Sequence, residues 1–165
     1  MEEETIHLVF SDLNLSEIVQ ETADSFSAIA GASEKNYTIQ IDSGIVFTGD
    51  RNSIHQLCSL LIDNALKYST DHGSIQVHLY QDKNIILEVS NTCDCIPDGN
   101  LDRLFDRFYR ADSSRNRQTG GYGIGLSVAR AIATSHGGTI TAQRDGDHMI
   151  RFIVTLPVHV KKKIL

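Results

Sequence analysis

Apolar residues recur at helical spacing in three long segments of the chain. These segments are Asn14–Ile29, Arg51–Ser69 and Tyr122–His136. Asn14 is placed to cap the first helix, and Glu17 follows three residues later in a capping-box pattern. Asp50 is placed to cap the second helix, and Gly137 ends the third. A shorter helix is predicted over Leu101–Phe108.

Seven other segments have the alternating pattern or the β-prone composition that is typical of strands. They are Thr5–Phe10, Tyr37–Asp42, Ile45–Thr48, Ser74–Tyr80, Asn84–Ser90, Thr139–Arg144 and Met149–Leu156. Short polar turns join the last six into three predicted hairpins, the first of which pairs Tyr37–Asp42 with Ile45–Thr48. Because helices alternate with hairpins, we expect a mainly antiparallel or mixed sheet with helices on one face.

The composition narrows the class of protein. The length of 165 residues predicts one domain over residues 1–165. Asp and Glu outnumber Lys and Arg by 21 to 15, and the net charge of −6 argues against nucleic acid as a partner. No apolar run has the length of a membrane-spanning helix, and no export signal is visible. The three cysteines are therefore expected to be reduced thiols in a cytoplasm.

Polar residues line one side of the second predicted helix, next to its apolar stripe. Asn64 and Lys67 are three residues apart, so their side chains are neighbours on one helix face. An amide oxygen can enter the coordination shell of Mg²⁺, and an ammonium can contact phosphate oxygens. The same pattern is also typical of an ordinary amphipathic helix with a polar edge.

Glycines precede the third helix in the run Gly120-Gly121-Tyr122-Gly123-Ile124-Gly125-Leu126. Glycines allow close approach of the backbone to an anion, and a helix N-terminus offers unpaired N–H groups. A dinucleotide-binding fingerprint needs a strand directly before its glycines, but here a long polar loop precedes them. The pattern therefore argues against a Rossmann-type dinucleotide site. The alternative is a flexible glycine hinge.

Two further segments carry possible chemistry. The thiols of Cys93 and Cys95 flank Asp94, but no second cysteine or histidine cluster completes a zinc site. Phe105 is predicted to anchor the start of the long loop in the core. Arg110 follows this anchor and is placed either to reach a phosphate with its guanidinium or to be a surface arginine.

The order and spacing of these motifs resemble the catalytic ATP-binding domain of bacterial sensor histidine kinases, within the wider ATPase family that includes DNA gyrase and MutL. Asn64-Ala65-Leu66-Lys67-Tyr68 looks like the asparagine box, and Phe105–Arg110 looks like the phenylalanine box. Gly121–Leu126 looks like the second glycine box. The resemblance extends from about Asp12 to Pro157.

The resemblance implies an α+β two-layer sandwich, with a mixed, mostly antiparallel sheet and three helices on one face. It also implies a site for ATP and Mg²⁺ between the helices and the loop Tyr109–Gly121. By position, Asn64 would hold Mg²⁺, Lys67 and Tyr68 would contact phosphates or ribose, and Arg110 would approach the γ-phosphate. Asn64, Lys67 and Arg110 are thus the catalytic candidates. Other ATP contacts are expected from Asn91, Cys95, Ile96, Phe105, Tyr109, Gly121, Tyr122, Gly123, Ile124, Gly125 and Leu126.

The implied reaction transfers the γ-phosphate of ATP to a histidine on a separate dimerisation domain, and then to an aspartate of a response-regulator receiver domain. None of the seven histidines here has the context of that acceptor. We therefore expect an excised, monomeric cytoplasmic domain that does not phosphorylate itself and that comes from a membrane-anchored protein. Its sensor and dimerisation domains would be absent from this chain.

One departure from the family pattern leaves alternatives open. The family's Asp-x-Gly-x-Gly adenine box aligns with Asn91-Thr92-Cys93-Asp94-Cys95, so its aspartate and both glycines are missing. A degenerate, non-catalytic nucleotide-binding module is therefore the second hypothesis, and binding of magnesium–ATP discriminates it from the enzyme. A serine kinase of the anti-sigma type is a third, which the phenylalanine box argues against.

Overall fold

The structure is a computed structural model that describes residues 7–107 and 124–158 of the chain. In chain order its elements are β1 (Phe10–Asn14), α1 (Leu15–Ser25), α2 (Ser27–Ala32), β2 (Asn36–Ile41), β3 (Val46–Asp50), α3 (Arg51–Tyr68), β4 (Ser74–Gln81), β5 (Ile85–Thr92), the 3-10 helix η1 (Leu101–Phe105), α5 (Ile124–Ser135), β6 (Thr139–Arg144) and β7 (Met149–Leu156). None of the helices in these two ranges is long and apolar enough to cross a membrane.

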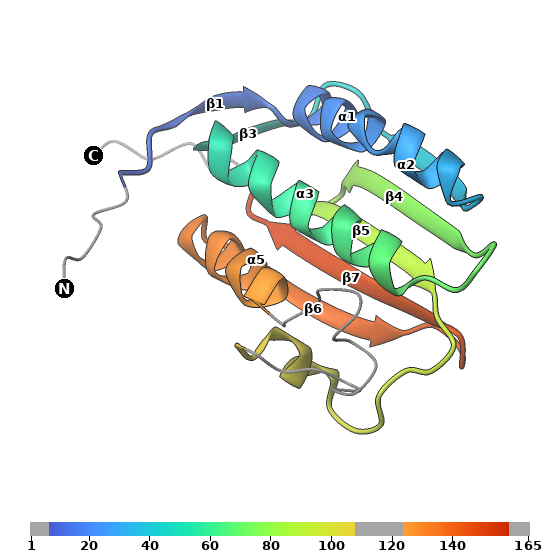
Figure 1. Cartoon of the computed structure of the whole chain (residues 1–165). Helices are drawn as coiled ribbons and strands as arrows, with labels where there is room; N and C mark the ends of the chain where they lie inside the picture. Colours follow the sequence, from blue (N-terminus) through green and yellow to red (C-terminus); the bar gives the residue numbers. More distant parts are fainter. Residues whose placement is uncertain (1–6, 108–123, 159–165) are drawn as a thin grey trace, which may run out of the picture.

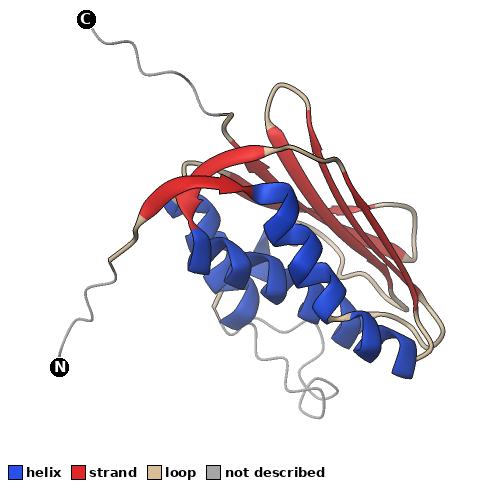
Figure 2. Ribbon diagram, turned by 90° about the horizontal axis from the view of Figure 1, so that it is seen from above, coloured by secondary structure: helices blue, strands red, loops and turns tan. Residues whose placement is uncertain are grey.

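The body of the molecule is a five-stranded sheet, with helices on one of its faces (Figure 1, Figure 2). Its strand order is β2-β4-β5-β7-β6. The pairing of β2 with β4 is parallel, and the other three pairings are antiparallel. This arrangement confirms the predicted α+β sandwich with a mixed, mostly antiparallel sheet. Strands β1 and β3 form a separate antiparallel pair.

The predicted hairpin of Tyr37–Asp42 with Ile45–Thr48 is wrong, although both segments contain strands. Strand β2 pairs with β4, and β3 pairs with β1. The hydroxyl of Ser16 explains the separation, since it donates to the carbonyl of Asp42 at 2.5 Å and accepts from the Ile45 N–H at 3.0 Å. The start of α1 thus holds the turn that directs the two strands into different sheets.

Several predicted boundaries also shift. The first helix is divided at Phe26 into α1 and α2, and the first strand begins at Phe10, where the prediction ended it. The predicted helix over 101–108 is a 3-10 helix that ends at Phe105, and the predicted start of the third helix at Tyr122 lies outside the described residues. Both predicted caps are confirmed, because the side chain of Asn14 accepts from the Glu17 N–H and that of Asp50 from the Ser53 N–H.

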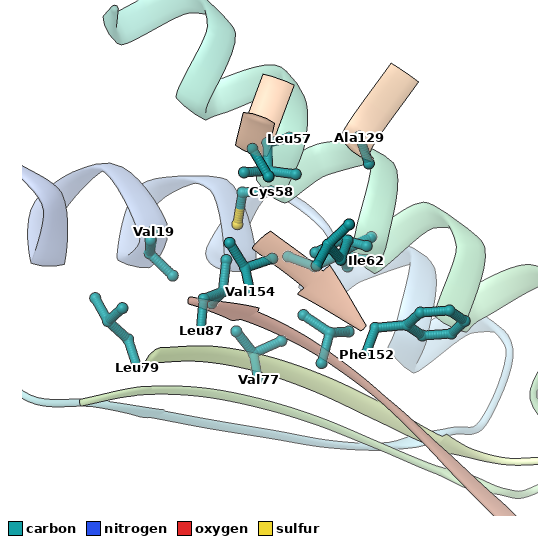
Figure 3. Close-up of a cluster of buried hydrophobic side chains, with 14 of the residues drawn as sticks. Val19, Leu57, Cys58, Ile62, Val77, Leu79, Leu87, Ala129, Phe152 and Val154 are labelled. Atoms are coloured by element: carbon teal, nitrogen blue, oxygen red, sulfur yellow. The ribbon is translucent and has the colours of Figure 1, made fainter. Parts of the chain in front are cut away.

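The hydrophobic core lies between the sheet and the helices (Figure 3). Helix α3 contributes Leu57, Cys58 and Ile62, which face Leu87 and Val154 from the sheet. Cys58 is fully buried, and burial raises the pKa of its thiol to about 12. It is therefore a core residue and remains a protonated thiol at neutral pH.

A buried histidine joins the end of α5 to the beginning of α3. His136 Nε2 accepts from the Asp50 N–H at 3.0 Å, so the ring proton is on Nδ1, which lies 2.8 Å from the carbonyl of Ile132. The ring of Phe10 stacks on this imidazole with centroids 4.8 Å apart. These contacts fix α3 and α5 relative to each other and to β1.

Candidate functional site

The C-terminal half of α3 presents the residues of the predicted asparagine box. Ala65 is fully buried and keeps this part of the helix in the core, while Asn64 and Tyr68 are half-buried and Lys67 is exposed. The Lys67 ammonium lies 3.1 Å from the carboxylate of Asp63, one turn back. Exposed pairs of this kind contribute little, on the order of 0.3–0.5 kcal/mol, so Lys67 is available to a stronger anion such as a phosphate.

Asn91 lies in β5 near its end and is 0% exposed. Its Nδ2 donates to the carbonyl of Thr92 at 3.0 Å, whereas its Oδ1 has no hydrogen-bond partner among the described residues. Buried acceptors are rarely left unpaired, because each lost hydrogen bond carries the full cost of desolvation. This oxygen therefore suits a ligand that offers an N–H group, as the exocyclic amine of adenine does.

A network of hydroxyls joins the end of α3 to the end of β5. Thr92 Oγ1 accepts from the Ser74 N–H at 3.0 Å and lies 2.9 Å from Thr70 Oγ1. The Lys35 ammonium adds bonds to the carbonyls of Ser69 at 3.1 Å and Thr70 at 2.5 Å. The helix that carries Tyr68 and the strand that carries Asn91 are therefore held together independently of any ligand.

Gly73 shows how closely this network is packed. A Cβ atom at Gly73 would lie 2.2 Å from Thr92 Oγ1 and 2.4 Å from Thr70 Oγ1, so a side chain there would displace the two threonines. Sequence reasoning did not find Lys35, Thr70 or Thr92. They act through contacts between segments that are distant in the chain, and no local motif marks them.

The segment after Asn91 carries the two cysteines. Cys93 is buried, its N–H donates to the carbonyl of His148 at 2.8 Å, and burial raises the pKa of its thiol. Cys95 is exposed and Ile96 is half-buried. Within residues 7–107 and 124–158, no three His, Cys, Asp or Glu side chains come together as a metal centre.

Phe105 is a buried residue at the end of η1. Its ring is 2% exposed and meets Phe152 edge-on, with centroids 6.0 Å apart. The Arg130 guanidinium of α5 lies over the Phe105 ring, 5.4 Å from the ring centroid, and forms an ion pair with Asp102 at 3.3 Å. The core anchor predicted for Phe105 is thus present, whereas direct contact of its ring with ATP stays a prediction.

The beginning of α5 lies beside α3. A Cβ atom at Gly125 would be 3.5 Å from Leu60 of α3, one turn before Asn64. Leu126 is buried in the core. Gly125, the second residue of α5, therefore lies next to the helix that carries Asn64 and Lys67.

The remaining candidates are not placed by the structure. Tyr109, Arg110, Gly121, Tyr122 and Gly123 lie outside the described residues. Ile124 begins α5, and the position of its side chain is not described. Of the predicted site, the structure thus joins the α3 residues to Asn91 through the threonine network and to Gly125 through Leu60.

Comparison with known proteins shows which family the chain resembles. Residues 49–160 match the family described as histidine kinase-, DNA gyrase B- and HSP90-like ATPase. The chain is 37% identical over 140 residues to the probable sensor protein PcoS of Escherichia coli, covering 84% of this chain and 30% of the relative. It is 32% identical over 159 residues to the sensor protein DltS of Streptococcus agalactiae, covering 96% of this chain and 40% of the relative. The chain thus spans less than half the length of these two relatives.

The fold has a close counterpart among solved structures. The catalytic domain of the histidine kinase ThkA superposes with a TM-score of 0.78, at 23% sequence identity, over 92% of this chain and 97% of that chain. The family match over residues 49–160 includes α3, β5 and α5, which carry the site described above. The chain therefore belongs to the histidine kinase-, DNA gyrase B- and HSP90-like ATPase family.

Proposed function

We propose that this chain is the ATP-binding catalytic domain of a sensor histidine kinase. The observation that carries the proposal is the unpaired, fully buried Oδ1 of Asn91. It lies at the strand end that the threonine network ties to the asparagine-box helix. Family membership makes ATP the nucleotide that fits this arrangement.

The roles of the residues follow from their chemistry. Asn91 accepts a hydrogen bond from the exocyclic amine of adenine, and Lys67 contacts phosphate oxygens. The amide oxygen of Asn64 is the ligand that this chain offers to Mg²⁺, which supplies charge neutralisation at the phosphates when bound. Tyr68 borders the same site from the end of α3. Arg110 is assigned to the γ-phosphate from its motif alone.

In the proposed reaction, a histidine nitrogen of a separate dimerisation domain attacks the γ-phosphorus. The bond from that phosphorus to the β–γ bridging oxygen breaks, and ADP leaves. A response-regulator aspartate then receives the phosphoryl group. This assignment is supported by the names of relatives, which are sensor proteins, and by a solved structure of ThkA in complex with a response regulator, which has a TM-score of 0.75 and 22% identity to this chain.

The setting of the domain is part of the same proposal. We place it in the cytoplasm, as a monomer when isolated, and as a part of a longer membrane-anchored protein. Nucleic acid is not among its proposed partners, because the net charge is −6.

A second candidate is a non-catalytic module that binds nucleotide weakly and regulates a partner by contact. The neutral amide of Asn91 and the side chains of Cys93 and Cys95, where the family has aspartate and glycines, favour it.

Two measurements distinguish the candidates. Calorimetric titration with magnesium–ATP and magnesium–ADP tests nucleotide binding. Incubation with γ-labelled ATP and a separately made dimerisation domain tests transfer. Acid-labile label on the dimerisation domain supports the kinase, whereas binding without label supports the regulatory module. Absence of binding at millimolar nucleotide contradicts the kinase and favours the regulatory module. Acid-labile label on this chain alone contradicts the expectation that it has no acceptor histidine.

A further inference from the structure

The segment between β5 and η1 has no strand or helix of its own, yet its backbone is tied down at three consecutive carbonyls. Arg144 Nη2 donates to the carbonyl of Pro97 and, at 2.8 Å, to that of Gly99. Arg103 Nη2 donates to the carbonyl of Asp98 at 3.3 Å. Irregular loops usually leave such carbonyls to water, so this segment is more constrained than its lack of regular structure predicts.

Arg144 reaches this segment from a distant part of the chain. It is the last residue of β6, 45 residues beyond Gly99 in sequence, and it begins the turn between β6 and β7. A guanidinium is a fixed set of N–H donors without any acceptor, which suits a pair of backbone carbonyls. Because Arg144 binds main-chain oxygens, it holds the path of the backbone and not a particular side chain.

The same turn holds the other end of the segment. The carbonyl of His148, on the β7 side of the turn, accepts from the Cys93 N–H at 2.8 Å. The hairpin of β6 and β7 therefore forms hydrogen bonds with the backbone of this segment at Cys93 and again at Pro97 and Gly99. Between these ties lie Cys95 and Ile96, directly after the strand that carries Asn91.

We propose that Arg144 is a positioning residue for the base-binding side of the nucleotide site. It holds residues 97–99 on the β6–β7 turn, and thereby sets the place of Cys95 and Ile96 beside Asn91. In this proposal Arg144 acts through the two carbonyls that its Nη2 binds, and not through a contact with the nucleotide. The inference rests on the proposed function, since it assumes that Asn91 binds the base.

The test compares the wild type with Arg144→Met, which keeps the length of the side chain and removes its donors. Loss of a charge-assisted bond at an exposed site predicts a decrease of about three- to tenfold in affinity for magnesium–ATP. Because the change acts on the base side, the same factor is expected for ATP and ADP. Amide hydrogen exchange over residues 94–100 should be faster in the variant.

Arg51→Met is the matched control, because Arg51 is an exposed arginine whose ion pair with Glu21, at 3.7 Å, lies at the other end of α3. It should bind nucleotide as the wild type does. If Arg144→Met does not fold, the same measurements are made on Arg144→Lys, for which a smaller decrease in nucleotide affinity is expected.

The outcomes separate the inference from the proposed function. If the wild type binds and Arg144→Met binds within twofold of it, the inference alone is overturned. A decrease for ATP without one for ADP also overturns it, because that pattern indicates a direct phosphate contact. If the wild type does not bind nucleotide, the proposed function is overturned first and this inference with it.

Discussion

Asn91→Ala should weaken ATP binding without weakening the fold. The substitution removes the Nδ2 bond to the Thr92 carbonyl, which costs about 0.5–1.5 kcal/mol. That carbonyl keeps a second donor, the Thr70 N–H at 3.1 Å, so it is not left unpaired. The substitution also removes an unpaired buried oxygen, whose desolvation penalty is about 1–3 kcal/mol. The two terms oppose each other, and their mid-range values differ by about 1 kcal/mol, so the free energy of unfolding should change by only about that amount.

Binding should respond differently. The Asn91 oxygen would form a neutral hydrogen bond with adenine, worth about 0.5–1.5 kcal/mol, so its removal should weaken ATP binding about two- to tenfold. Titration calorimetry measures the dissociation constant, and urea unfolding followed by circular dichroism measures the stability.

The neighbouring residue supplies a matched control. Thr92→Val removes the acceptor of the Ser74 N–H and the partner of the Thr70 hydroxyl, so the free energy of unfolding should fall by about 1–3 kcal/mol. The backbone bond from the Thr70 N–H to the Thr92 carbonyl remains and still joins the two segments. The dissociation constant of this variant for ATP should therefore stay within about twofold of the wild type, measured at a temperature where both are folded. The reasoning is refuted if Asn91→Ala loses more than about 2 kcal/mol of stability while its ATP affinity is unchanged. That result would make Asn91 a structural residue.

Three further changes test other parts of the site and the fold. Asn64→Ala should abolish the magnesium-dependent part of ATP binding in calorimetry and shift stability by no more than about 0.5 kcal/mol; a large loss of stability would contradict the assigned role. Arg110→Ala should slow transfer of label from ATP more than it weakens ADP binding, because ADP lacks the γ-phosphate; equal effects would remove Arg110 from that role. The pKa of Asp50 is lowered because its carboxylate accepts hydrogen bonds from the Val9 N–H and from Ser53. The contribution of ionised Asp50 to folding stability is therefore complete above the unfolded pKa of about 3.9. It is lost as the pH falls through the lower pKa of the folded state. Urea unfolding between pH 2 and 7 should therefore show a loss of stability below pH ~4 that is smaller in Asp50→Asn, and identical profiles would show that Asp50 does not contribute.

Local features of the fold were predictable where the signal lies within a few residues. The caps at Asn14 and Asp50 depend on a side chain and an N–H only three positions apart, so sequence spacing is sufficient to find them. The hairpin of β6 and β7 was predicted with its observed bounds, because two alternating segments are joined by a short Asp-Gly-Asp turn. The order of the asparagine, phenylalanine and glycine motifs was sufficient to indicate the family, which the match over residues 49–160 confirms.

The amino-acid sequence by itself determined where most of the helices and strands lie, and which side chains have the chemistry of a nucleotide site. Only the tertiary structure decided which strands pair, since a period of two marks a strand but carries no information about its partner. It also decided that one oxygen of Asn91 is buried without a donor, because burial and pairing depend on residues such as Ile75 and Ile150 from neighbouring strands. The role of Arg144 likewise has no local signal, since its partners lie more than forty residues earlier and are main-chain carbonyls that any sequence possesses.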